Sequence, residues 1–91
     1  MVKFVEIVKD MNKFSLREVF INPAHVVSLR EDGFMKQHLK EGRLPSNLDV
    51  RQDFTKIILN KGTTGQEVIV IGLPSLVESK LKGEGRGLLN G

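Results

Sequence analysis

The clearest structural signal in the chain lies in residues 54–71, which read FTKIILNKGTTGQEVIVI. Two runs rich in β-branched residues, Phe54–Leu59 and Glu67–Ile71, flank a polar segment with two glycines, which is typical of two strands joined by a hairpin loop. Both runs are almost continuously apolar, and such strands are usually buried on both faces. The sequence therefore predicts either that the C-terminal helix covers one side of this hairpin and a second layer covers the other, or that the hairpin packs against another subunit.

The N-terminal part of the chain predicts three more strands. Val2–Lys9 and Phe14–Ile21 are rich in β-branched and aromatic residues, and the turn formers at 10–13 separate them by a hairpin length. Asn22 and Pro23 then bend the chain, because proline fixes φ and has no N–H to donate. A third strand is expected at His25–Arg30.

The segment Leu73–Lys82 predicts a short helix. Ser75 and Glu78 have the spacing of a capping box, and Gly83 is suited to end the helix. A helix of about ten residues is not stable alone and must dock on the sheet. Four apolar residues are expected on its buried face: Leu73, Leu76, Val77 and Leu81. Residues 83–91, GEGRGLLNG, are expected to be a flexible Gly-rich tail.

Residues 34–53 are too long for a hairpin connection between two strands. Phe34–Glu41 predicts about two turns of helix with Phe34, Met35 and Leu39 turned inward, and Gly42 is expected to stop it. Long excursions from small scaffolds commonly carry function. We therefore predict a partner-binding surface on this insertion. Its residues are Phe34, Met35, Lys36, His38, Leu39, Lys40 and Arg43.

Together these segments predict an α+β fold. It consists of a small antiparallel β-meander of about five strands, a short C-terminal helix packed on one face, and a helical insertion between strands three and four. Residues 1–82 form the single domain, with the insertion at 34–53, and residues 83–91 form the tail. The sequence shows no repeat at a solenoid period.

Composition argues against several classes of function. The 91 residues include no cysteine, which excludes disulfides, thiolate zinc sites and a cysteine nucleophile. His25 and His38 have no neighbour at metal-ligand spacing, and no serine lies in a G-x-S-x-G elbow. The G-x-x-G at 62–65 stands between two strands, so a hairpin turn explains it better than a nucleotide-clamping loop. We expect no enzyme, cofactor or metal, and a cytoplasmic location without a membrane span.

The positive charge supports an alternative, a regulator that binds nucleic acid. The chain has 14 Lys and Arg residues against 11 Asp and Glu residues. The last twelve residues include three of these basic residues and one acidic residue. Basic residues beside an aromatic ring could neutralise phosphates while a base stacks on Phe34. The residues expected to make nucleic-acid contacts are Lys36, Lys40, Arg43, Lys80, Lys82 and Arg86.

The order of the segments Phe20–Leu29, Thr55–Leu59, Glu67–Val70 and Leu73–Leu81 resembles that of the small FlbD-like proteins found in flagellar gene clusters. The insertion and the Gly-rich tail depart from that pattern, as does the long loop after Leu59. The resemblance implies a compact accessory or regulatory protein without catalytic residues.

The main expectation is a non-catalytic binding or regulatory module that acts through protein contacts. One ten-residue helix cannot cover both faces of strands as apolar as 54–59 and 67–71. The uncovered face is therefore expected to pack against a second copy, giving a homo-oligomer, and an unidentified protein is expected to bind the insertion.

Overall fold

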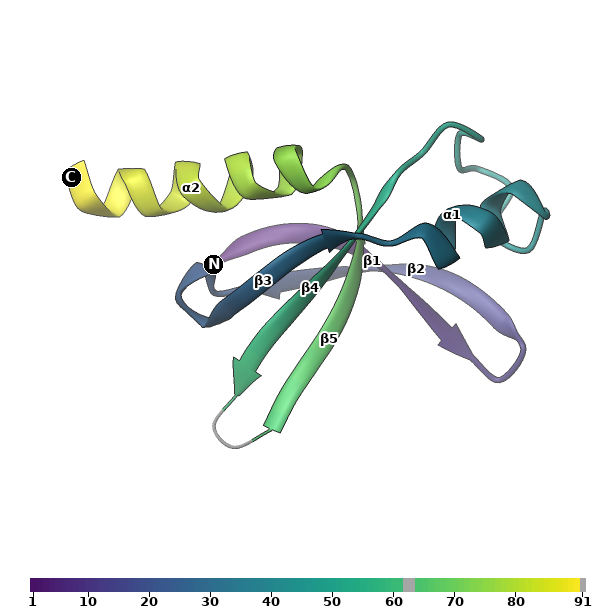
Figure 1. The fold of residues 1–91 in the computed structure, drawn as a ribbon, viewed down its shortest axis with the longest axis horizontal. Helices are drawn as coiled ribbons and strands as arrows, with labels where there is room; N and C mark the ends of the chain where they lie inside the picture. Colours follow the sequence, from purple (N-terminus) through teal and green to yellow (C-terminus); the bar gives the residue numbers. More distant parts are fainter. Residues whose placement is uncertain (62–63, 91) are drawn as a thin grey trace.

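The computed structural model describes the backbone of residues 1–61 and 64–90, and the side chains of residues 1–60 and 65–83. It contains five strands, two α-helices and one short 3-10 helix (Figure 1). In chain order they are β1 (Val2–Asp10), β2 (Lys13–Ile21), η1 (Pro23–His25), β3 (Val26–Glu31), α1 (Gly33–Lys40), β4 (Phe54–Lys61), β5 (Thr64–Ile71) and α2 (Pro74–Asn90).

The strands form one antiparallel sheet in the order β2-β1-β5-β4-β3. A β-rich α+β fold is thus observed. A simple meander is not, because β2 and β3 follow each other in the chain but lie at opposite edges of the sheet. The chain crosses between those edges through the bend at Asn22, whose side chain accepts a hydrogen bond from the N–H of Ala24. His25 ends the 3-10 helix η1 and does not begin β3.

Two hairpins make up most of the sheet. In the first, Asp10 pairs with Lys13 across a two-residue turn in which Met11 has a φ of 57°. In the second, pairing continues to Lys61 and Thr64, so the strands are longer than the sequence predicted and the loop is correspondingly shorter. Strand pairing extended into the polar segment because glycine and threonine there can still make ladder hydrogen bonds. The G-x-x-G at 62–65 lies partly outside the described residues.

One face of the sheet is covered by α2. Val77 and Leu81 of the helix pack against Phe4, Ile57 and Val70 from three neighbouring strands. The full buried set of this first cluster is Val2, Phe4, Ile21, Ile57, Val68, Val70, Val77 and Leu81. Docking of the C-terminal helix on one face, as the sequence predicted, is confirmed.

The other face is covered by the chain between β3 and β4. Met35 and Leu39 of α1, with Leu44 from the irregular segment that follows, form a second cluster with Ile7 and Phe54. The expectation that this face is left uncovered and needs a partner is therefore wrong. Both faces of β4 and β5 are buried, as their apolar runs predicted, but residues 33–48 of the same chain form the second layer.

Gly42 ends α1 as the sequence predicted. Its φ is +74°, its N–H donates to the carbonyl of Leu39 at 3.1 Å, and the N–H of Arg43 donates to the carbonyl of His38 at 3.0 Å. This pair of bonds is the Schellman arrangement, which needs a residue in the left-handed conformation. The chain then turns back toward the start of β4.

Three details of the helices differ from the sequence predictions. The ring of Phe34 is 81% exposed, because it occupies the first turn of α1 on the side away from the sheet. Leu73 and Leu76 are also exposed, since α2 contacts the sheet mainly through Val77 and Leu81. The helix α2 continues to Asn90, well past Gly83. Glycine weakens a helix by only ~1 kcal/mol and, unlike proline, does not remove a hydrogen bond. Within the described residues, neither helix combines the length and hydropathy of a membrane span.

Candidate functional site

The structure divides the predicted partner surface into buried and exposed parts. Met35 and Leu39 lie in the second core cluster, so they cannot meet a partner without local unfolding. Their assignment to a binding surface is wrong, because the amphipathic face of α1 points at the sheet. Phe34, on the same helix, is the apolar residue that solvent reaches.

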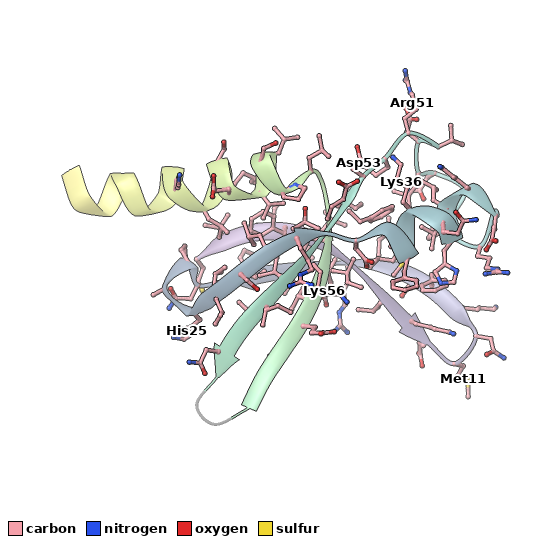
Figure 2. The ribbon with its side chains drawn as sticks, viewed as in Figure 1. Met11, His25, Lys36, Arg51, Asp53 and Lys56 are labelled. Atoms are coloured by element: carbon pink, nitrogen blue, oxygen red, sulfur yellow. The ribbon has the colours of Figure 1, made fainter. Side chains whose placement is uncertain are left out.

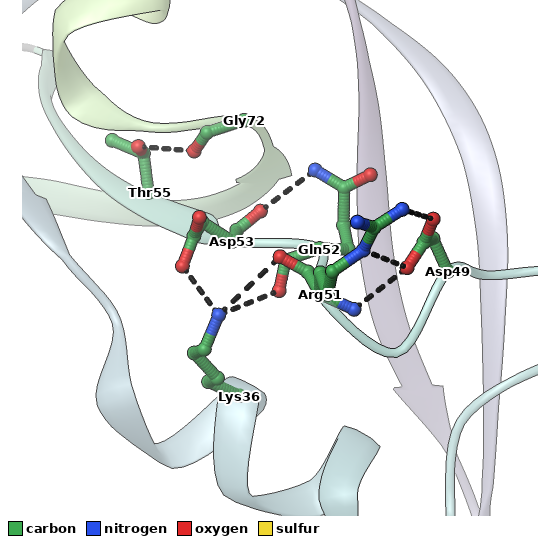
Figure 3. Close-up of polar contacts among 7 residues, drawn as sticks. All are labelled: Lys36, Asp49, Arg51, Gln52, Asp53, Thr55 and Gly72. Atoms are coloured by element: carbon green, nitrogen blue, oxygen red, sulfur yellow. Dashed lines mark hydrogen bonds and ion pairs between the residues drawn. The ribbon is translucent and has the colours of Figure 1, made fainter.

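Lys36, which lies beside Asp53 in Figure 2, serves as an internal clamp. Its Nζ lies 2.6 Å from Oδ1 of Asp53 and 3.4 Å from the backbone carbonyl oxygens of Arg51 and Gln52 (Figure 3). Both side chains of the ion pair are about three-quarters buried. The ammonium group thus fastens α1 to the segment that leads into β4, and its charge is matched within the protein.

His38, Arg43 and Lys40 lie farther along the same stretch. The His38 ring is tilted against Phe14 with ring centroids 5.1 Å apart, and Nη1 of Arg43 lies 3.2 Å from its Nδ1. Nη1 of Arg43 also lies 2.7 Å from the carboxylate of Glu41. Lys40 is exposed and makes no hydrogen bond or ion pair with the part of the chain that the structure describes. Of the four Lys and Arg residues in the insertion, three have partners within the protein, namely Lys36, Arg43 and Arg51. Lys40 is thus the one described cation of the insertion that is left uncompensated.

The basic residues of α2 are also engaged. Nζ of Lys80 donates to the carbonyl of Lys3 at 2.9 Å and lies 4.8 Å from the ring centroid of Phe4. Lys82 pairs with Glu78 one turn earlier at 3.5 Å. The side chain of Arg86 lies outside the described residues. Since α1 and α2 lie at opposite ends of the molecule, the six predicted nucleic-acid contacts do not form one surface (Figure 1).

A groove that the sequence did not reveal lies where β5 turns into α2. Two adjoining hollows of about 300 and 240 Å³ share Gly72 and Leu76. We call them together the corner groove. The first hollow is lined by Asp49, Arg51, Gln52, Asp53 and Leu73, and the second by Phe4, Val5, Ile71, Val77 and Lys80.

The wall of the corner groove is held by two hydrogen bonds to the backbone of Gly72. Its N–H donates to the carbonyl of Asp53 at 2.9 Å. Its carbonyl accepts from the hydroxyl of Thr55 at 2.7 Å (Figure 3). Gly72 has a φ of +123°, which residues with a Cβ rarely adopt. This geometry directs the start of α2 across the sheet and leaves Leu76 61% exposed between the two hollows.

Asp49 and Arg51 form an exposed ion pair on one rim of the corner groove. Nη2 of Arg51 lies 3.3 Å from Oδ2 of Asp49, and the backbone N–H of Arg51 donates to Oδ1 at 2.8 Å. The side-chain hydrogen bonds from Arg51, followed by its backbone N–H, lower the pKa of the Asp49 carboxyl below its usual value. Asp49 therefore stays ionised at all but strongly acidic pH.

A third hollow, of about 320 Å³, lies apart from the corner groove on the same sheet face as α2. We call it the concave pocket. Glu6 pairs with Arg17 across β1 and β2 and with Val70 across β1 and β5, so these side chains share that face. Nε of Arg17 donates to Oε1 of the buried Glu6 carboxylate. The remaining lining comprises four polar residues, Asn22, His25, Asn60 and Gln66, and six apolar residues, Met1, Val19, Phe20, Ile21, Leu59 and Val68.

Within the described residues, no three His, Asp or Glu side chains come close enough together to hold a metal ion. Comparisons with protein-family models, with curated proteins and with solved structures found no match.

Proposed function

We propose that this protein is a non-catalytic binding module that acts through protein–protein contacts and that it self-associates through the corner groove. A regulatory or accessory role, of the kind that the FlbD-like resemblance implies, forms part of this proposal. The observation that carries it is the position of Leu76, an exposed apolar side chain with an open hollow on either side.

A protruding side chain beside a hollow large enough to receive it is suited to an isologous dimer. In such a dimer, a two-fold axis places the same patch of one copy on that of the other. Leu76 of each copy would enter a hollow of its partner, and the exposed parts of Val5 and Leu73 would be covered in the same step. Other exposed apolar residues, such as Met11 and Val27, line no hollow together with Leu76, and scattered apolar residues are normal on protein surfaces.

The size of the effect can be estimated from burial. Covering a fully exposed leucine stabilises by ~1.5–3 kcal/mol, so covering the exposed 61% of Leu76 contributes about 1–2 kcal/mol in each copy. Both copies together then contribute roughly 2–4 kcal/mol, which corresponds to a factor of about 30 to 1,000 in the dissociation constant.

Sedimentation velocity from micromolar to millimolar protein tests the proposal. The unmodified chain is expected to dimerise. Leu76→Asp is expected to weaken the dimer by about thirtyfold or more, because a charge would enter the more apolar hollow, which Phe4, Val5, Ile71 and Val77 line. Met11→Asp is the control, since Met11 is 90% exposed in the turn between β1 and β2 and lines neither hollow of the corner groove. A chain that stays monomeric throughout, or equal effects of the two substitutions, would contradict self-association through this groove.

Nucleic-acid binding is the alternative that the same preparation can address. Phosphate contacts make affinity fall steeply with salt. Because Lys36, Arg43, Lys80 and Lys82 already have partners within the protein, we expect no binding of single-stranded RNA or DNA at low salt. Binding that weakens with salt, and that is lost in Lys40→Ala, would support the alternative.

A further inference from the structure

We propose that the concave pocket binds a monocarboxylate attached to a compact apolar body, with Arg17 as the receptor for the carboxylate. This site is separate from the corner groove, and the proposal does not depend on self-association. It starts from a charged pair in a hollow whose other lining residues are six apolar and four polar side chains.

The placement of the pair follows from the sheet. Glu6 and Arg17 are direct cross-strand neighbours, and the side chains on either side of Arg17 along this face of β2 are Ser15 and Val19. Because the sheet is twisted, Leu59 of β4 and Val68 of β5 line the same hollow. The pair thus lies against an aliphatic wall, where charge–charge and hydrogen-bond interactions are stronger than in water.

Glu6 and Arg17 are unequally exposed. The side chain of Glu6 is only 8% exposed, whereas that of Arg17 is 67% exposed. Nε of Arg17 is used by Glu6, and the two terminal amino groups make no hydrogen bond with the part of the chain that the structure describes. A guanidinium that is held at Nε keeps a planar fork of N–H donors, which matches the two oxygens of a carboxylate.

The nature of the anion follows from the local charge. Glu6 already offsets much of the positive charge of Arg17, so the pair can compensate little of the cost of removing an anion from water. That cost is larger for a doubly charged phosphate than for a singly charged carboxylate. Val19, Leu59 and Val68 favour an apolar body next to the anionic group. A hollow of about 320 Å³ corresponds to the liquid volume of about ten water molecules, which limits that body to roughly ten non-hydrogen atoms.

Two sources could present this chemistry, namely a small free acid and the C-terminal residue of a peptide. Phenylpropionate represents the first and N-acetyl-leucine the second. Each has a primary amide of nearly the same shape, which serves as its uncharged control. Binding is followed in proton–nitrogen and methyl correlation spectra of the full chain, with Val19, Leu59 and Val68 as reporters.

At least one acid is expected to shift the three reporters with an affinity about tenfold or more above that of its amide, since charge-assisted hydrogen bonds are about twice as strong as neutral ones. If only phenylpropionate binds, the natural ligand is a free acid; if only N-acetyl-leucine binds, it is a chain terminus. Equal shifts by an acid and its amide, or no shift with either acid at millimolar concentration, would overturn the proposal.

Substitutions of Glu6 and of Arg17 should change the affinity for the acid in opposite directions. Glu6→Gln removes the competing negative charge while keeping an acceptor for Nε, so the affinity for the acid should rise severalfold. Arg17→Lys keeps the countercharge of Glu6 but loses the fork, so the affinity should fall about tenfold. Glu18→Gln is the control, because Glu18 neighbours Arg17 on β2 but pairs with Lys3 on the opposite face.

A purely structural ion pair would behave differently. It would change the free energy of unfolding in the variants of Glu6 and Arg17 and leave no preference for acid over amide. If Arg17→Lys does not fold, Glu6→Gln still decides the matter, since an unchanged or lower affinity for the acid in that variant contradicts the proposal.

Discussion

Truncation of Leu39 to alanine tests whether the chain between β3 and β4 is part of the core. Leu39 is 7% exposed and packs in the cluster that contains Phe54 and Ile7. Buried Leu→Ala substitutions cost ~2–5 kcal/mol, because transfer free energy is lost and a cavity remains. A domain of 91 residues has a total stability of about 5–14 kcal/mol, so Leu39→Ala should remove a large part of it. A loss of about 3 kcal/mol should lower Tm by about 12–24 °C.

The measurement is urea unfolding of Leu39→Ala beside Phe34→Ala. Phe34 lies on the same helix but is exposed, so its truncation should change the free energy of unfolding by less than about 0.5 kcal/mol. Deletion of residues 35–48 should prevent folding, because it removes Met35, Leu39 and Leu44 together. If the deletion variant unfolds cooperatively near the unmodified chain, or if the two alanine variants lose the same stability, α1 is not part of the core.

Three further experiments address local features. Gly72→Ala should lose about 1–3 kcal/mol of stability in thermal unfolding, because a φ of +123° is strained for alanine even though its Cβ would meet nothing closer than 3.7 Å. Lys36→Met and Asp53→Asn should show a coupling of about 1 kcal/mol in a double-mutant cycle, since the ion pair is largely but not fully buried; additive effects would show that the clamp contributes nothing. In Arg51→Ala, a carboxyl titration followed by NMR should show the pKa of Asp49 rising toward its usual value. Because the folded pKa of Asp49 is depressed, the stabilisation it contributes is present above its unfolded pKa and is lost as pH falls through the folded pKa. In Arg51→Ala this acid-dependent loss should become smaller but not vanish, because the backbone N–H of residue 51 still donates to Asp49.

The strands were predictable because hairpins are local. The turn formers at 10–13 and the glycines at 62 and 65 each separate two β-rich runs, and the structure pairs those runs as expected. The pairing of β1 with β5 was not predictable from local pattern, since it joins Glu6 to Val70 across most of the chain. The composition of a strand does not show whether it lies at the edge or in the centre of this sheet, because that position depends on contacts with distant parts of the chain.

The sequence predicted both helices, but it did not predict which of their side chains would face the sheet. Leu73, Leu76, Val77 and Leu81 all fall within a broad apolar stripe at helical spacing, and the sequence does not say which part of that stripe the sheet will cover. The docking direction of α2, set by the turn at Gly72, decides that Leu76 stays exposed. The corner groove therefore depends on a tertiary angle and has no signature in the sequence.

The Glu6–Arg17 pair, in contrast, had a signal that could have been used. A two-residue turn at 11–12 fixes the register of the first hairpin, and in that register position 6 lies opposite position 17. An acidic residue on the inward face of a strand that otherwise carries Val2 and Phe4 needs a countercharge, and the register supplies Arg17. The concave nature of the surrounding face could not be read in the same way, because it comes from the twist of the whole sheet.

Two-sided burial of β4 and β5 does not by itself call for a second copy. The same apolar runs are satisfied by α2 on one face and by Met35, Leu39 and Leu44 on the other, all from one chain. A small domain gains more from covering its own sheet than from relying on a partner, because an intramolecular layer is always present and loses no translational freedom on docking. The self-association that we propose through Leu76 would then be an addition to a folded monomer and not a condition of folding, so a charge at Leu76 should separate the copies without unfolding either of them.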